Sequence, residues 1–267
     1  MMRRLPPSKW DTVRSLLADT PENCSALFLL DSAVSTVIVD HEQNPNFVSI
    51  SYPHTTPPLY FLYGQAEQLI FIQRFLGQLK HPADLVITRS LFPVASRFWP
   101  VRFAIPVLFL AAPTSWRPQS AADFRIRLLH PEDVGLLRKG FAVEDWLWDF
   151  FATPEALLAN GQVTAAFIDG EIASVATTLA YSPRYSELGV ATRPEYHGRG
   201  LALECARALS RIQFEEFGRL PCWRTHTGNI GSWKTALRLG LEETPHSEQF
   251  IFLSNYEHLG AKATVAP

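Results

Sequence analysis

The sequence has few of the residues that hold disulfide-rich or metal-binding proteins together. Only three cysteines occur among 267 residues (Cys24, Cys205 and Cys222), and no two of them form a C-x-x-C pair. Scattered cysteines of this kind argue against a disulfide framework or a zinc site, and they favour a reducing compartment. We therefore expect a cytoplasmic protein with no metal site.

Charge of one sign and long apolar runs are also missing. The formal net charge is −2, so the chain has no overall basic field to attract nucleic acid or anionic lipid. No run approaches the ~18 apolar residues that a membrane-spanning helix needs. The composition thus argues against membrane and nucleic-acid partners, while its 47% of hydrophobic residues suffice for the core of two ordinary domains.

The most informative segment, residues 187–207, runs from an apolar strand through a glycine turn into an amphipathic helix. Gly198 and Gly200 remove side-chain bulk, so the N–H groups of residues 199–202 can converge on an anion at the positive end of the helix. The helix is indicated by apolar residues at three- and four-residue spacing, namely Leu201, Cys205, Leu209 and Ile212. The segment therefore predicts a nucleotide-bearing cofactor.

Two common phosphate-binding loops do not fit this turn. A P-loop needs Gly-Lys-Ser/Thr, which is absent, and a dinucleotide fingerprint needs a third glycine where Leu203 stands. The segment His197-Gly-Arg-Gly-Leu-Ala202 resembles instead the pyrophosphate loop, Q/R-x-x-G-x-G/A, of the GCN5-related N-acetyltransferases (GNAT). It departs from that pattern in one residue, with His197 in place of Gln or Arg.

Neighbouring segments strengthen the resemblance. Asp169-Gly170 is typical of a two-residue turn between strands at Val163–Ile168 and Ile172–Tyr181, which resembles the central hairpin of the family. Residues 221–241 resemble the fifth strand of the family and its fourth helix, here opened by Asn229. Several motifs therefore follow one another in the order and at the spacing that the family shows.

The resemblance covers about half of the chain, roughly Phe124 to Leu253. The string from Ser186 to Tyr196 is similar to the branch that includes the zwittermicin-resistance acetyltransferase, whose members carry an extra N-terminal region. The resemblance implies an α/β fold of the GNAT type, with a mixed central sheet flanked by helices. It also implies acetyl-CoA as the cofactor.

Residues 111–122 contain two prolines and no apolar period, so they are typical of a linker. We expect a boundary near residue 120, between a smaller N-terminal α/β domain (1–120) and a catalytic domain (121–267). The N-terminal half is predicted to contain helices at residues 9–17, 22–30, 66–79 and 92–98 and strands at residues 36–40, 47–52, 59–63, 85–88 and 105–110. This order resembles that of the C-terminal half, as a degenerate GNAT-like repeat would. Because Tyr63-Gly-Gln-Ala66 holds one glycine, we expect no cofactor there, and we favour a scaffold that walls the substrate cleft over a second catalytic site.

The resemblance also implies a set of cofactor-binding residues. Backbone groups near Val190 and Thr192 would line the pantetheine arm, and a strand N–H would stabilise the oxyanion. Amides of the glycine turn would bind the diphosphate, and Arg199 would add a charge. Asn229 matches a position that contacts the cofactor in relatives, although its role as a helix cap explains it equally well. The expected set is Val190, Thr192, His197, Gly198, Arg199, Gly200, Leu201, Ala202, Asn229 and Ser232.

Two residues are candidate catalytic bases. Glu187 lies near the start of the strand where related enzymes carry a glutamate that deprotonates the amine through water, and a solvent-facing strand carboxylate is the alternative interpretation. His226, at the end of the next strand, is the alternative base or proton relay, although a lone histidine at a strand end is more often structural. Many relatives place a tyrosine as general acid where Ala236 stands, so the sequence assigns no acid.

Residues 144–151 contain two tryptophans, two phenylalanines and three carboxylates that could hold an amine in an acceptor pocket. Ordinary packing, with Trp148 and Phe151 at core spacing, is the interpretation that we favour. The leading function is transfer of an acetyl group from acetyl-CoA to a primary amine of a small molecule, by direct attack in a ternary complex. The alternatives are a non-catalytic acyl-CoA-binding or sensing module and an acetyltransferase that acts on a protein or tRNA.

Overall fold

The computed structural model describes residues 2–32, 34–55, 57–64, 66–79, 82–119, 126–142, 144–245 and 250–255. The N-terminal half contains β1 (Arg3–Leu5), η1 (Pro7–Lys9), α1 (Asp11–Arg14), η2 (Pro21–Asn23), α2 (Cys24–Leu29), β2 (Thr36–Val39), β3 (Phe47–Tyr52), β4 (Leu59–Gly64), η3 (Ala66–Gln68), α3 (Leu69–Leu76), β5 (Asp84–Thr88), η4 (Arg89–Leu91), α4 (Phe92–Phe98) and β6 (Phe103–Ala111). The C-terminal half contains β7 (Ile126–Leu128), η5 (Pro131–Asp133), α5 (Val134–Gly140), η6 (Asp145–Phe151), α6 (Pro154–Asn160), β8 (Val163–Ile168), β9 (Glu171–Tyr181), β10 (Tyr185–Thr192), η7 (Pro194–Tyr196), α7 (Leu201–Phe217), β11 (Leu220–His226), α8 (Ile230–Arg238), β12 (Glu242–Glu243) and β13 (Phe250–Ser254).

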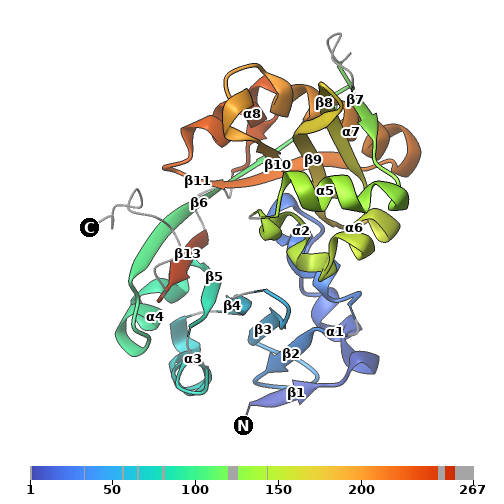
Figure 1. The fold of residues 1–267 in the computed structure, drawn as a ribbon. Coiled ribbons are helices and arrows are strands. Elements are labelled where there is room, and N and C mark those ends of the chain that lie inside the picture. The colour runs from blue at the N-terminus through green and yellow to red at the C-terminus, as the bar shows by residue number, and fades with distance from the viewer. Residues whose placement is uncertain are drawn as a thin grey trace.

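The strands form one sheet in the order β1-β2-β3-β4-β5-β13-β6-β11-β10-β9-β8-β7, with β12 paired to β6 (Figure 1). In each half four strands pair antiparallel, and the fourth then pairs parallel with a fifth: β1 to β5 in one half, β7 to β11 in the other. A parallel pair needs a crossover connection, and a helix supplies it in each half, α3 or α7. This mixed sheet flanked by helices confirms the α/β fold expected from the sequence.

Two strands join the halves. Strand β6 pairs with β13 along Phe103–Pro106 and with β11 along Val107–Ala111. Strand β13, which comes from the far end of the described chain, lies between β5 and β6. Figure 1 shows β6 running from one half to the other with β13 beside it. The halves therefore share strands, and the boundary expected near residue 120 lies outside the described residues.

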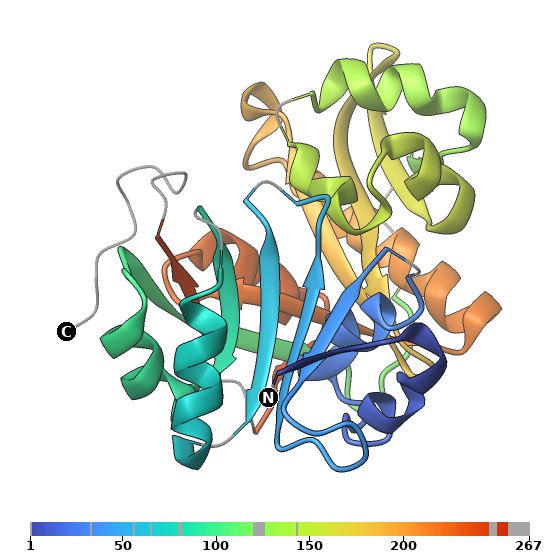
Figure 2. The ribbon, with the colours of Figure 1, turned by 90° about the horizontal axis from the view of Figure 1, so that it is seen from below.

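Apolar side chains form three buried clusters. One packs α3 and α4 against the N-terminal strands, and a second packs α7 and α8 against the C-terminal strands. The third lies between the halves, where the ring of Phe28 on α2 stands 5.2 Å from that of Phe151 and 4.8 Å from that of Tyr181. Figure 2 shows α3 and α4 beside the N-terminal strands, away from the C-terminal half. Burial of the shared cluster holds the two halves together.

The segment expected to be a linker is packed where the structure describes it. Trp116 is 6% exposed, and its Nε1 donates to the backbone oxygen of Leu239 at 3.0 Å. Its ring also meets Phe214 of α7, with centroids 5.8 Å apart. The chain that follows β6 is therefore tied to α7 and to the end of α8.

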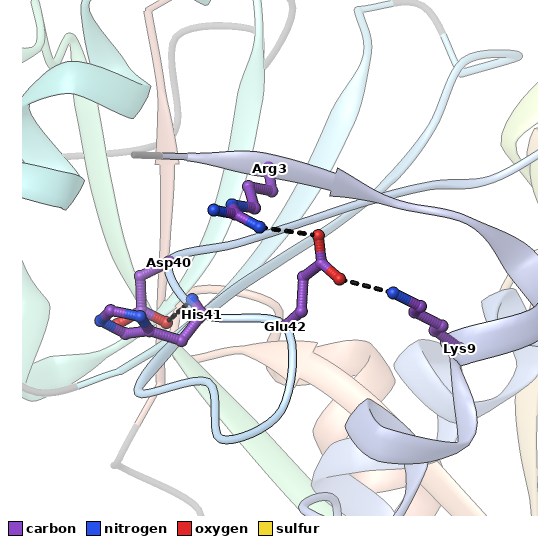
Figure 3. Close-up of polar contacts among 5 residues, drawn as sticks. All are labelled: Arg3, Lys9, Asp40, His41 and Glu42. Carbon is purple, nitrogen blue, oxygen red and sulfur yellow. Dashed lines mark hydrogen bonds and ion pairs between the residues drawn. The ribbon is translucent and has the colours of Figure 1, made fainter.

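Polar contacts fix the N-terminal strand to the loop after β2. Glu42 accepts hydrogen bonds from Lys9 Nζ at 2.5 Å and Arg3 Nη1 at 3.1 Å (Figure 3). These bonds, first that of Lys9, lower the pKa of Glu42. Asp40 Oδ1 accepts the backbone N–H groups of His41, Asn46 and Phe47, which closes the loop. Because the ion pairs are exposed, we expect the loop closure by Asp40 to matter more for stability.

The sequence predicted the hairpin of the C-terminal half more closely than the first helices. Asp169 and Gly170 both have positive φ (51° and 82°), as a two-residue type I′ turn requires. The helix expected at residues 9–17 is wrong in extent, because a 3₁₀ turn opened by Pro7 and the four-residue α1 stand there.

Among the described residues, no helix is both long and apolar enough to span a bilayer.

Candidate active site

The site lies where β10 and β11 separate. These parallel strands pair at only three positions, of which the last is Glu187↔Cys222. Beyond it β10 stays paired with β9 as far as Thr192, and β11 stays paired with β6 as far as His226. On the side that faces β11, the backbone of β10 after Glu187 therefore has no ladder partner in the described part of the chain.

A cavity of about 600 Å³ fills this opening. Its walls come from β10, the glycine turn, the start of α7, β11 and α8. The lining residues are Trp146, Leu179, Leu188, Gly189, Val190, Thr192, Tyr196, His197, Gly198, Gly200, Leu201, Ala202, Leu203, Trp223, Arg224, Thr225, His226, Asn229, Gly231, Ser232, Thr235 and Arg238. The cavity brings together nine of the ten expected cofactor-binding residues and His226.

Strand alternation divides the cavity between the two faces of the sheet. Leu188 and Trp223 belong to the cluster under α7 and α8. Arg224 points to the opposite face, because its guanidinium lies over the ring of Phe61, 5.7 Å from the centroid, and Phe61 belongs to the cluster between the halves. His226, two residues further along β11, shares that face. The cavity therefore crosses the sheet through the gap between the strands.

The glycine turn has the geometry that anion binding requires. Gly198 and Gly200 have φ of 76° and 79°, a left-handed conformation that side chains disfavour, and the space beside both is open. Helix α7 starts at Leu201, and no side chain caps its N-terminus. A 17-residue helix with uncapped N–H groups at the cavity wall is a suitable place for a diphosphate.

Of the two polar side chains expected to assist this turn, one is bonded to the backbone and the other lies outside the cavity lining. His197 places Nε2 2.7 Å from the backbone oxygen of Thr192, so the ring ties the turn to the end of β10. Arg199 does not line the cavity, and its guanidinium lies over the ring of Tyr196, 5.2 Å from the centroid. The turn therefore offers its backbone N–H groups, rather than these two side chains, to an anion.

Asn229 caps the second helix of the site. Its Oδ1 accepts the backbone N–H of Ser232 at 3.1 Å, which confirms the predicted N-cap of α8. The hydroxyl of Ser232 accepts the indole N–H of Trp223 at 2.8 Å. Both polar residues line the cavity, so the cap and a cofactor contact are compatible roles.

The structure separates the two candidate bases. Glu187 is 2% exposed and does not line the cavity; its carboxylate accepts from Ser25 Oγ at 2.5 Å and from Arg224 Nε at 2.9 Å. His226 lines the cavity, and its burial lowers its pKa below the usual 6.5, which favours the neutral imidazole at neutral pH. Its Nδ1 is buried beside Gly228 and has no hydrogen-bond partner within the described residues.

Several lining residues were missed by the sequence analysis. Arg224 shares the alternation of His226 on β11, and this signal was available in the sequence. Thr235 and Arg238 lie on α8, whose facing side could not be deduced without its packing. Of the aromatic block at residues 144–151, Trp146 is 41% exposed and lines the cavity, whereas Phe151 is buried in the core. Ala236 is buried and has no proton to donate, so the general acid stays unassigned.

A model of the GNAT acetyltransferase family matches residues 112–247, and the chain belongs to this family of enzymes. An N-acetyltransferase of Streptomyces virginiae is 33% identical over 93 residues, which cover 34% of this chain and 39% of that protein.

Solved structures share the fold across both halves. A GCN5-related N-acetyltransferase-like protein from Streptococcus suis matches with a TM-score of 0.67 and 21% identity, covering 93% of this chain and 99% of that one. A tandem GNAT protein from the clavulanic acid biosynthesis pathway matches with a TM-score of 0.58 and 11% identity, covering 95% and 98%. At these identities the likeness shows the fold alone.

Proposed function

We propose that the chain transfers an acetyl group from acetyl-CoA to a primary amine of a small molecule, by direct attack in a ternary complex. The observation that carries the proposal is the cavity between β10 and β11, because it joins a phosphate-type glycine turn on one side to His226 on the other. A donor and an acceptor can then meet in the gap from opposite faces of the sheet, which provides the proximity that direct transfer needs.

The residues present fit acetyl-CoA. The open left-handed glycines and the uncapped start of α7 would hold its diphosphate, and the unpaired backbone of β10 at Val190 and Thr192 would hold its pantetheine arm. When bound, the cofactor supplies the acetyl group as an activated thioester. A β10 N–H that faces the gap would stabilise the developing oxyanion.

His226 is the base that the geometry favours. Its imidazole lines the cavity on the same face of the sheet as Arg224, which we assign to the acceptor and call the acceptor face. Burial favours the neutral ring, so Nε2 can take the proton of the attacking amine. Glu187 would act differently: its carboxylate already accepts two hydrogen bonds, and we propose that it positions Arg224.

The test is release of free CoA thiol from acetyl-CoA in the presence of a library of small amines. We expect amine-dependent release that His226→Gln lowers by ~10²-fold or more, the usual contribution of a general base. Calorimetry with CoA shows whether each variant still binds the cofactor. Amine-independent release, or no release despite CoA binding, would contradict the proposed transfer.

We further propose that the chain belongs to the zwittermicin-resistance-type branch and that its N-terminal half is a degenerate GNAT-like repeat that serves as scaffold. The repeated strand order and the fold likeness to the tandem protein support the repeat. Ser25 of the N-terminal half bonds to Glu187 of the other half, which supports a role in walling the site.

A cytoplasmic location is likewise a proposal, supported by three free cysteines.

A further inference from the structure

Of the described residues that line the cavity, Arg224 and Arg238 carry a permanent charge, and Arg224 is the one on the acceptor face. Its Nε donates to Glu187, and its guanidinium makes no other hydrogen bond within the described residues. A guanidinium has five N–H donors in a rigid fork, so the two terminal nitrogens retain donors for a ligand. With 20% of the side chain exposed, against 3% for that of Glu187, the cation is the partner that faces the cavity.

Both halves hold this guanidinium in place. Glu187 fixes Nε from β10, and Ser25 on α2 fixes the carboxylate in turn. The guanidinium carbon lies over the ring of Phe61 on β4, 5.7 Å from its centroid. A preorganised, partly desolvated guanidinium binds a carboxylate through charge-assisted, bidentate hydrogen bonds, and little side-chain entropy is left to lose.

The surroundings define the rest of the ligand. His226 lies two residues further along the same strand, which corresponds to roughly 7 Å along the strand. An amine that reaches its imidazole therefore lies about that far from Arg224. Leu179 and the half-exposed Trp146 supply an apolar wall nearby. We propose that Arg224 forms an anion subsite that selects acceptors carrying a carboxylate beside the reacting amine and an apolar side group, as amino acids do. This inference rests on the proposed function, because it assigns the acceptor class of the same cavity.

The test compares amines that differ only in the carboxylate. The probes are L-phenylalanine against 2-phenylethylamine and L-leucine against 3-methylbutylamine, followed by CoA thiol release. We expect kcat/KM to be at least tenfold higher for the carboxylate-bearing member of each pair, because a site built to bond a group rejects the analogue that lacks it. Arg224→Gln should bring the ratio close to one, and Arg224→Lys should keep part of it.

Two further variants separate the subsite from folding and from general charge effects. Arg224→Gln leaves the buried Glu187 carboxylate without a counter-charge, so the double variant Arg224→Gln/Glu187→Gln removes both charges and should also bring the ratio close to one. Lys234→Gln makes the same change in charge at an exposed position of α8 that does not line the cavity, and it should leave the ratio unchanged. A ratio of one in the wild type, or a preference that survives in the double variant, overturns the subsite.

Binding distinguishes failure of the inference from failure of the proposed function. Calorimetry on the CoA-loaded protein compares N-acetyl-L-phenylalanine with N-(2-phenylethyl)acetamide, and we expect at least tenfold tighter binding of the acid. If no amine is acetylated, the transfer is wrong while this comparison still decides the anion subsite. Equal affinities, or no binding of the acid, overturn the subsite even if amines are acetylated.

Discussion

The two halves of the chain repeat one sheet pattern, but the cavity of about 600 Å³ that holds the candidate site opens between the fourth and fifth strands of the C-terminal half. In the N-terminal half β4 and β5 pair at four positions, and the helix that follows β4 is the eight-residue α3. In the C-terminal half β10 and β11 pair at three positions, and a turn with two left-handed glycines leads into the 17-residue α7. The comparison teaches that the sheet is a scaffold, while the turn and the helix it starts carry the chemistry.

The largest effect on this comparison is expected from His226→Gln, which removes the imidazole from the cavity side of β11. We expect kcat/KM to fall by ~10²–10⁴-fold, as for loss of a general base. Thr88→Val, at the end of the corresponding strand of the other half, should change kcat/KM less than about twofold. A large loss in both variants would contradict the assignment of catalysis to one half.

The pH profile sharpens the same assignment. Burial lowers the pKa of His226, and a base acts in its deprotonated form. kcat/KM should therefore decrease as the pH is lowered through a midpoint below 6.5, and this acid limb should disappear in His226→Gln. A limb that persists in the variant would assign it to another group.

A smaller effect is expected from Leu253→Ala in β13, the strand that the C-terminal end of the described chain contributes to the N-terminal half. Leu253 is fully buried, so truncation should cost about 2–5 kcal/mol of unfolding free energy. Since the halves share strands, calorimetry should still show one transition. Leu237→Ala, at a 39% exposed position of α8, is the matched control and should cost less than about 0.5 kcal/mol. Two separate transitions would show that the halves unfold independently.

The double variant Gly198→Ala/Gly200→Ala tests the turn itself. We expect CoA to bind one site per chain, with its affinity at least tenfold weaker in the variant because left-handed backbone costs an alanine about 1–2 kcal/mol per residue. Gly218→Ala introduces the same strain (φ 67°) at the far end of α7 and should lower stability without lowering affinity. A stoichiometry of two would place a second site in the N-terminal half and break the comparison.

The smallest effect is expected from Asn229→Ala. Loss of the cap of α8 should lower stability by about 1 kcal/mol, and Asn229→Asp should retain it. The corresponding helix of the N-terminal half, α4, has no side-chain cap. Calorimetry with CoA on both variants then shows whether Asn229 also contacts the cofactor. Weaker binding in Asn229→Ala alone would mean that the helix cap affects binding, and weaker binding in both variants would mean that the amide contacts CoA directly.

Much of each half could be predicted from local sequence signals. The Asp169-Gly170 turn, the bounds of β3 and the cap at Asn229 all follow from residue types that favour one local conformation. The position of β13 could not be predicted, because pairing between strands far apart in the chain leaves no local pattern. The same limit hid the pairing of Glu187 with Arg224 and Ser25, since three separate elements must come together before those side chains meet.

The insertion of β13 also sets the order in which the molecule can be completed. Domains usually fold in turn as they leave the ribosome, the N-terminal one first. Here β5 and β6 remain open edges in the nascent chain until residues 250–254 have been synthesised and enter between them. The N-terminal half is therefore synthesised first, but its sheet is completed last. Until then, unpaired strand edges of this kind favour aggregation.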